Sequence, residues 1–241
     1  MKINTSQRWH ASFPGGHVGL LLVAGIDNRK RKTPLDARKR ELEASLREQY
    51  AGFSRADFLK LEVLAAYRDY YKSFGNTYHV QLQLESVATK NKPLPNVNPL
   101  VDANFVAELE TLVLTAGHDA DLLEEPVTID ASQGDETFTQ MNGKTKTLKP
   151  NDMMMRDGQD VVCSIIYGQD ARTPISETTT RALYVAYAPT GVPKETVEQQ
   201  LTAITQNIQL VTADVRVELL EVITAENTAA NDAQQTVGKA S

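Results

Sequence analysis

Five polar side chains lie near the middle of the chain in a pattern that suits chemistry. The segment NPLVDANF, residues 98–105, carries Asp102 and Asn104 within an otherwise apolar stretch, and GHDAD, residues 117–121, places His118 beside two aspartates. An imidazole titrates near neutral pH, so His118 is the natural group to orient a water molecule or accept a proton. Short Asp and Asn side chains bond readily to backbone groups, which predicts that Asp102 and Asn104 brace the helix preceding the histidine.

Other reactive residue types give weaker patterns. Cys163 is the one cysteine, so the sequence predicts no intrachain disulfide and a small buried side chain at this position. No glycine-rich phosphate loop with a lysine is present. The four histidines lack the spacing of a zinc site, so we expect neither a metal nor another cofactor; they are His10, His17, His79 and His118.

Elements upstream of His118 are predicted to be mainly helical. Residues 17–26 are rich in leucine and valine between glycines, which is typical of a buried strand. Apolar residues recur at helical spacing in several segments, and Asn98-Pro99 marks the start of the last of them. Helices are therefore predicted over residues 34–50, 54–74, 78–89 and 99–114.

The second half of the chain has the texture of short strands. Glycine, asparagine, aspartate and proline separate apolar runs, and MNGK is typical of a hairpin turn. Strands are predicted over residues 126–131, 136–141, 144–149, 152–157, 161–168, 181–189 and 215–223, with a helix over 194–208. The predicted fold is α+β, a single domain over residues 1–223 in which early helices pack on a strand-rich, sandwich-like second half. The polar segment 224–241 is predicted to be a disordered tail.

Composition predicts a globular protein, and charge is spread unevenly along it. The chain has 241 residues, 41% of them hydrophobic, and no apolar run approaches the roughly 20 residues that cross a bilayer. Without a signal-peptide pattern, we expect a cytoplasmic protein without a membrane partner. The net charge is −6, yet residues 1–100 carry 16 Lys and Arg against 9 Asp and Glu. A basic half can present a phosphate-binding face.

Several motifs, in order, resemble one known family. VNPLVDANFVAELETLVLTAGHDAD is similar to the segment of the bacterial phenylalanyl-tRNA synthetase β subunit that reads N-P-V-V-D-x-x-N-Y, a helix, and H-A-F-D. Residues 134–168 resemble the strands and hairpin that follow, and residues 177–183 resemble a Glu-Thr-x-x-x-x-Leu strand. Together these motifs, over roughly residues 80–190, resemble the B3/B4 editing domain of that subunit. Aminoacylation motifs are absent, so a complete ligase is not expected.

The resemblance implies an activity and a set of site residues. The implied reaction is hydrolysis, in trans, of the ester between a wrong amino acid and the terminal ribose of tRNA, with tyrosine on a phenylalanine tRNA as the family's typical error. His118 matches the editing-site histidine and is expected to be catalytic. Asn104 and Gly168 are expected at the pocket, and Tyr184 occupies the position of a substrate-recognising glutamate. In a strand from residue 178 to 180, either Thr178 and Thr180 or Thr179 alone would face it.

Two functions from different classes remain open. One is the editing hydrolase, which binds a mischarged tRNA end. The other is a non-catalytic module that uses the same pocket to bind tRNA, a free aromatic amino acid or a nucleotide, and the loss of the glutamate at position 184 favours it. No DNA partner is expected under either. The expected RNA contact is the basic run Arg29, Lys30, Arg31 and Lys32, whose alternative interpretation is a solvated surface.

The basic run generates a prediction. Neutralising Arg29, Lys30, Arg31 and Lys32 together is expected to weaken tRNA binding and to flatten its salt dependence. Each phosphate contact releases counterions when it forms, so binding with fewer contacts depends less on salt. Binding measured across a salt series tests this. An unchanged affinity and an unchanged slope would show that the run is only a solvated surface.

Overall fold

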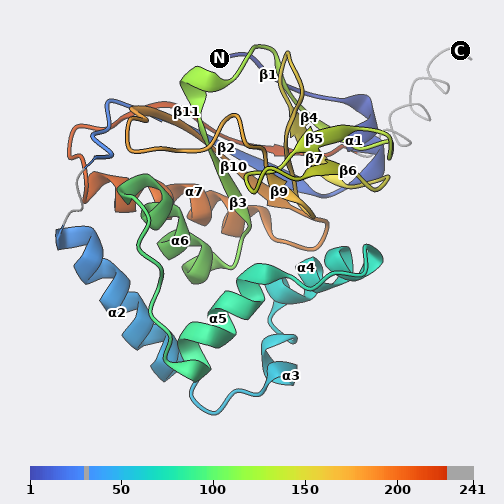
Figure 1. Ribbon diagram of the computed structural model, residues 1–241. Helices are drawn as coiled ribbons and strands as arrows, with labels where there is room; N and C mark the ends of the chain where they lie inside the picture. Colours follow the sequence, from blue (N-terminus) through green and yellow to red (C-terminus); the bar gives the residue numbers. More distant parts are fainter. Residues whose placement is uncertain (30–32, 227–241) are drawn as a thin grey trace, which may run out of the picture.

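The computed structural model describes residues 1–29 and 33–226 and confirms an α+β fold (Figure 1). A five-stranded sheet has the order β1-β4-β7-β8-β9, a four-stranded sheet has the order β11-β2-β10-β3, and β5 pairs with β6 in a hairpin. The strands are β1 (Ile3–Thr5), β2 (His17–Ala24), β3 (Thr115–Asp119), β4 (Val127–Ala131), β5 (Thr137–Thr139), β6 (Thr145–Thr147), β7 (Met153–Arg156), β8 (Val161–Ser164), β9 (Gly168–Gln169), β10 (Arg181–Ala188) and β11 (Arg216–Thr224).

The helices contact both large sheets and one another (Figure 1). They are α1 (Gln7–Ser12), α2 (Thr33–Gln49), α3 (Arg55–Phe58), α4 (Glu62–Ser73), α5 (His79–Lys90), α6 (Pro99–Thr111) and α7 (Lys194–Gln209), with a short 3-10 turn η1 (Ala120–Leu122). Helix α7 contacts β2, and α6 packs on α7. Gly19 permits the close approach of α7, because a Cβ there would lie 2.7 Å from Val197. Within the described ranges, no helix is long and apolar enough to cross a membrane.

The central strands are buried because sheets and helices cover both of their faces. All eight residues of β2 are buried, and β2 pairs with both β10 and β11 in antiparallel register. Side chains of both large sheets belong to one hydrophobic core. Such burial explains why β2 reads as a continuous apolar run rather than an alternating one.

A buried ion pair fixes the start of α6 to α2. The Lys39 Nζ lies 2.8 Å from the Asp102 Oδ2, and both side chains are at most 6% exposed. The other Asp102 oxygen accepts the Val97 backbone N–H at 2.9 Å, and Lys39 also donates to the Asn96 side chain and to the Pro95 carbonyl. Asp102 therefore braces the helix as predicted, through a partner 63 residues away.

The predicted helix over residues 54–74 is broken into α3 and α4. Phe58 packs with Tyr50 and Phe53, whereas Tyr67 on α4 stacks on Tyr78, with ring centroids 4.1 Å apart. One straight helix would not place Phe58 and Tyr67 in these two aromatic clusters, so the chain turns between Phe58 and Glu62. The aromatic residues of α4 lie largely in the core, as their helical spacing indicated.

The segment around His118 and both chain ends differ from prediction. Helix α6 ends at Thr111, where Leu112 adopts a left-handed φ of 64°, and His118 then lies within a strand, β3. At the N-terminus, β1 and α1 carried too few periodic residues to be predicted. Strand β11 extends through Thr224, and the Ala225 N–H donates to the Gly16 carbonyl at 2.8 Å. The rest of the predicted tail, residues 227–241, lies outside the described residues.

The buried ion pair generates a stability prediction. Lys39→Met is expected to lower the free energy of unfolding by about 3–5 kcal/mol, because it leaves the Asp102 carboxylate buried without its cation. Lys60→Met is the matched control: Lys60 also lies 2.8 Å from a carboxylate, Asp57, but is 75% exposed. Urea unfolding of both variants measures the difference, which is expected to be small for Lys60. Equal effects would show that burial of the pair contributes nothing.

Candidate functional site: a cavity at the edge of strand β3

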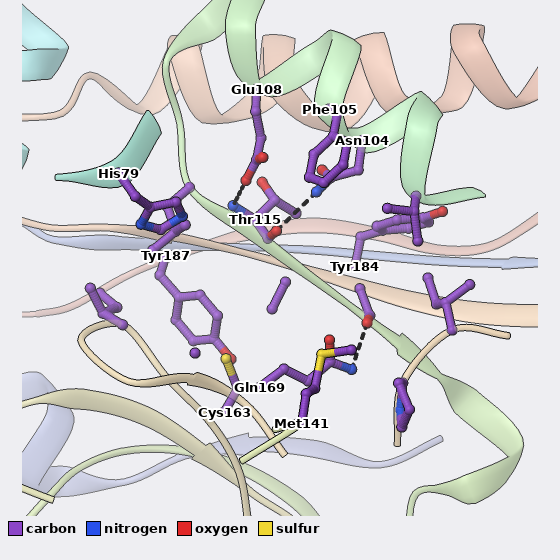
Figure 2. A pocket seen from close by; sticks show the side chains of 18 of the residues that line it. His79, Asn104, Phe105, Glu108, Thr115, Met141, Cys163, Gln169, Tyr184 and Tyr187 are labelled. Atoms are coloured by element: carbon purple, nitrogen blue, oxygen red, sulfur yellow. Dashed lines mark hydrogen bonds between the residues drawn. The ribbon is translucent and has the colours of Figure 1, made fainter. Parts of the chain in front are cut away.

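A cavity of about 540 Å³ opens beside β3, between helices α5 and α6 and the segment 163–169 (Figure 2). Most of its wall is apolar or aromatic, which is typical of a small-molecule site. The polar and ionisable residues of the wall are His79, Gln83, Asn104, Glu108, Thr115, Cys163, Ser164, Tyr167, Gln169, Tyr184 and Tyr187. Two exposed apolar side chains also line it, Val97 and Met141.

Strand β3 forms one wall because it is the last strand of its sheet. Several of its backbone groups that point away from β10 are bonded by side chains, whereas the Asp119 N–H donates to the Thr173 carbonyl at 2.9 Å. The Thr115 N–H donates to the Glu108 Oε1 at 2.8 Å, and the Asn104 Nδ2 donates to the Thr115 carbonyl at 2.9 Å. The Gln169 Nε2 donates to the Gly117 carbonyl at 2.8 Å. Three cavity residues therefore hold the strand edge in place (Figure 2).

Asn104 lies on the wall of the cavity, and its amide forms hydrogen bonds there. Besides its bond to Thr115, its Oδ1 accepts from the Gln200 Nε2 at 3.3 Å. The side chain is 6% exposed. Asn104 therefore joins α6, β3 and α7, which explains why a polar residue stands on the buried face of α6.

His118 does not line the cavity. Its side chain is 0% exposed, and its Nδ1 lies 2.7 Å from the Thr173 Oγ1. The Thr173 hydroxyl donates to the Asp170 Oδ1, so we assign the imidazole proton to Nδ1, donating to Thr173. The remaining nitrogen, Nε2, is buried and has no hydrogen-bond partner among the described residues. Burial lowers the pKa of His118 to about 3, so the ring is neutral and shielded from solvent.

Gln169 connects His118 to the cavity. Its amide donates to two carbonyls, those of Gly117 at 2.8 Å and Thr173 at 3.0 Å, and lies 3.2 Å from the His118 Nδ1. Both amide hydrogens are used in this way. The orientation of the amide is thus fixed, and its carbonyl oxygen is not used in these bonds.

The ionisable groups of the cavity wall are neutral near pH 7. Burial raises the pKa of Glu108 to about 8 and that of the Cys163 thiol to about 12. Burial also lowers the pKa of His79. No lysine or arginine of the described residues lines the cavity. The wall of the cavity therefore offers shape and uncharged hydrogen-bonding groups.

Two buried tyrosines of β10 line the cavity in different states. The Tyr184 hydroxyl donates to the Leu100 carbonyl at 2.9 Å. The Tyr187 hydroxyl, also fully buried, has no nitrogen or oxygen partner in the described part of the chain, and its hydrogen-bond neighbour is the Cys163 thiol. Tyr184 was predicted at the pocket from the sequence, whereas Tyr187 was not.

The other predicted residues divide between two cavities. Gly168 lines the main cavity with a left-handed φ of 80°. Thr178 and Thr180 instead line a second cavity of about 220 Å³, together with Arg29. Strand β10 starts only at Arg181, so strand alternation does not apply to the threonines. Thr179 is buried and donates to the Asp119 Oδ2 at 2.6 Å, and Lys30, Arg31 and Lys32 lie outside the described residues.

Three residues of the site were missed in the sequence. Glu108 follows Asn104 by four positions, so helical spacing places both side chains on one face of α6. This spacing was a signal from which Glu108 could have been predicted. Gln169 carries no comparable signal, because its partners are 52 and 4 residues away on different elements. The position of the Tyr187 hydroxyl at the cavity wall, beside Cys163, depends on how β10 packs in the tertiary structure, so the sequence carries no signal for it.

Comparison with known proteins identifies one family. The family model described as B3/4 domain matches residues 66–211. No curated protein is a significant match. Among solved structures, the chain is similar to an N-terminal fragment of the phenylalanyl-tRNA synthetase β subunit from Pyrococcus horikoshii, at 12% sequence identity and a TM-score of 0.47. The similarity covers 92% of this chain and 50% of that fragment, so this chain spans half of its length.

The raised pKa of Glu108 generates a pH prediction. Above the ordinary value of 4.5 and up to about 8, the folded protein holds a proton that the unfolded chain releases. The stability contributed by the protonated carboxyl is therefore lost as pH rises through this range. Between pH 7.5 and 8, a unit or more above the ordinary histidine value of 6.5, the histidines with lowered pKa contribute little, and the free energy of unfolding is expected to fall by up to about 1.4 kcal/mol per pH unit.

Glu108→Gln is expected to remove this slope, and urea unfolding at several pH values measures it. The exposed Glu41→Gln is the matched control and is expected to leave the slope as in wild type. A slope that survives Glu108→Gln would assign the proton to another group.

Proposed function

Because the chain belongs to the B3/4 domain family, we propose that it hydrolyses the aminoacyl ester of mischarged tRNA in trans, with the wrong amino acid held in the cavity beside β3. The observation that carries the proposal is this open-mouthed cavity, whose volume of about 540 Å³ suits an amino acid together with part of a ribose. Its wall is built from the same segments, α6 to β3 and residues 163–169, that carry the family motifs.

The proposed reaction needs few protein groups. An aminoacyl ester is already activated, so a positioned water and a donor for the developing oxyanion are sufficient. Residues 115, 117 and 119 turn their backbone groups away from β10, so the Gly117 N–H points to the cavity side and is the proposed oxyanion donor. The Gln169 carbonyl oxygen, whose amide is fixed, is the proposed acceptor that orients the water.

Glycine at position 117 fits this role and the packing. A Cβ there would lie 2.8 Å from Ile175 and 3.1 Å from Tyr184, so a side chain would displace the wall or close the space above the amide.

In this proposal His118 is a positioning residue. Its neutral ring bonds Thr173 and adjoins Gln169, so it holds the group that faces the substrate without touching the reacting atoms. This assignment replaces the sequence-based role of orienting water or adenosine, because the ring is fully buried outside the cavity.

The proposed RNA contact combines two basic regions. Arg29 lies at the second cavity, and its Nε is 3.0 Å from the Asp27 carboxylate. In the sequence it is followed by the basic residues Lys30, Arg31 and Lys32. Lys144 and Lys146 are exposed on the hairpin of β5 and β6, close in sequence to Met141 at the main cavity. A tRNA end entering the cavity would meet the hairpin lysines first, and its phosphates would gain from their charge.

A binding module is the second candidate, and the neutral cavity favours it. Glu108 is protonated at neutral pH and His118 is shielded, so neither is available as a general base. In this alternative the same cavity binds the aminoacyl end of a tRNA or a related small molecule without cleaving it.

Deacylation of a panel of purified aminoacyl-tRNAs, with tyrosine and alanine mischarged members and their cognate counterparts, tests the proposal. Selective hydrolysis of a mischarged member by wild type is expected. Ala116→Phe, which places a ring in the cavity, is expected to abolish hydrolysis, and the exposed Ala51→Phe is the control that retains it. Binding without hydrolysis of any member would reject the hydrolase in favour of the binding module.

His118→Gln separates positioning from base catalysis in the same assay. A positioning role predicts a rate reduced by less than about tenfold and a pH–rate profile between pH 5 and 8 of wild-type shape. A fall of about a hundredfold or more, with loss of an inflection near the pKa of imidazole, would restore His118 as the base.

A further inference from the structure

The turn between β8 and β9, residues 165–167, is held from behind the cavity wall by one buried aspartate. Asp152 is 0% exposed, and its Oδ2 accepts the Ser164 hydroxyl at 2.5 Å and the Ile166 backbone N–H at 3.3 Å. The Ser164 Oγ in turn accepts the Tyr167 N–H at 3.0 Å. Ser164, Ile166 and Tyr167 line the main cavity, whereas Asp152 does not. The carboxylate therefore fixes part of the wall without reaching the cavity.

Asp152 is itself fixed by the protein core. Its Oδ1 accepts the Tyr70 hydroxyl of α4 at 2.8 Å, and its backbone N–H donates to the Ser132 Oγ at 2.9 Å. The Tyr70 hydroxyl also accepts the Met153 N–H at 2.6 Å. The position of the carboxylate is thus set by α4 and by the segments beside it, and the turn takes its position from the carboxylate.

The partners of the Asp152 side chain are all donors, which fits an ionised carboxylate. Such a group only accepts hydrogen bonds. The Tyr70 and Ser164 oxygens already accept the N–H groups of Met153 and Tyr167, so their hydrogens remain for Asp152. A protonated carboxyl would carry a hydrogen of its own toward one of these donors and displace it. The hydrogen-bond pattern therefore matches the charged form.

The charged form of Asp152 lowers the stability of the fold. Among the described residues no lysine or arginine forms an ion pair with it, and burial raises the pKa of its carboxyl from 3.8 to about 6. Between these values the folded protein holds a proton that the unfolded chain releases, so stability is lost as pH rises toward 6. A buried charge that costs stability at neutral pH is expected of a group that serves a site.

The titratable neighbours of Asp152 are neutral near pH 7. Burial raises the pKa of each of them, and they are Tyr70, Tyr71, Cys163, Tyr167 and Tyr187. His79 lies beyond Tyr71, with its Nδ1 3.4 Å from that hydroxyl, and burial lowers its pKa. A variant of Asp152, and not a change of pH alone, therefore separates its titration from that of His79.

We propose that Asp152 is a positioning residue of the cavity, whose ionised carboxylate fixes the turn between β8 and β9 and thereby Gln169, and whose protonation releases that turn. Gln169 follows the turn in β9 and donates to the carbonyls of Gly117 and Thr173. The inference rests on the proposed function only where it gives Gln169 a role in hydrolysis. The link between Asp152 and the turn is measured without any substrate.

Amide hydrogen exchange of Ile166 and Tyr167, followed by NMR on the ligand-free protein, tests this link. Between pH 7 and pH 5, the protection of both amides in wild type is expected to fall by about tenfold or more relative to amides of β2, which report opening of the whole fold. Asp152→Asn places an N–H₂ donor among the donors and is expected to give low protection at both pH values. Tyr70→Phe removes a donor to the charged form and is expected to move the midpoint to higher pH.

Asp130→Asn is the matched control. Asp130 is also buried, at 4% exposed, and accepts the Ser6 hydroxyl, but it is paired with Arg8 and does not line the cavity. This variant is expected to lower the melting temperature and to leave the protection of the turn as in wild type. Asp152→Asn is expected to leave the melting temperature at pH 7 unchanged or higher, because it removes a buried charge that has no cation.

The deacylation assay then measures the consequence for the site. Wild type is expected to lose activity below pH 6, and Asp152→Asn to reduce the rate at pH 7 by about tenfold or more and to remove this inflection, which His118→Gln retains. Protection that is equal at pH 5 and pH 7 in wild type, or that survives Asp152→Asn, overturns the inference. If the turn follows Asp152 but no aminoacyl-tRNA is hydrolysed, the hydrolase fails and the inference stands. If mischarged tRNA is hydrolysed while protection ignores Asp152, the function stands and the inference fails.

Discussion

The backbone of an edge strand must find hydrogen-bond partners inside the protein, and this constraint shapes the site. Strand β3 ends its sheet, so the outward N–H and carbonyl of Thr115 and the carbonyl of Gly117 are bonded by side chains of Glu108, Asn104 and Gln169. Side chains occupy less of that edge than another strand would. The residues that hold the strand are therefore also the residues that line the cavity.

The same arrangement makes the cavity neutral. A carboxyl that accepts a backbone N–H deep in the protein is poorly solvated, and burial raises the pKa of Glu108 to about 8. His118 loses its charge for the same reason, since its ring lies behind the edge, bonded to Thr173. Recognition in such a site would depend on shape and on pairing of uncharged groups.

Stability and site geometry are coupled through helix α6. Its first turn is tied to α2 by the buried pair of Lys39 and Asp102, and its N-cap, Asn98, accepts from the Asn28 side chain at 3.1 Å. The far end of the helix meets β3 through Glu108. A helix fixed at both ends holds Asn104 and Glu108 at defined positions relative to the sheet, which a catalytic or binding site requires.

The sequence by itself determined the α+β class, the long helices, the buried strand β2 and the family motifs, because hydrophobic periodicity and local turn residues are short-range signals. It also suggested Asn104, Gly168 and Tyr184 as pocket residues; all three lie on the wall of the main cavity, and their role stays a prediction. Only the tertiary structure decided that the segment of His118 is an edge strand, that its ring is covered by Thr173, and that the helix after Ser54 breaks. These outcomes depend on pairing and packing between residues far apart in the chain, whose energies have no period in the sequence.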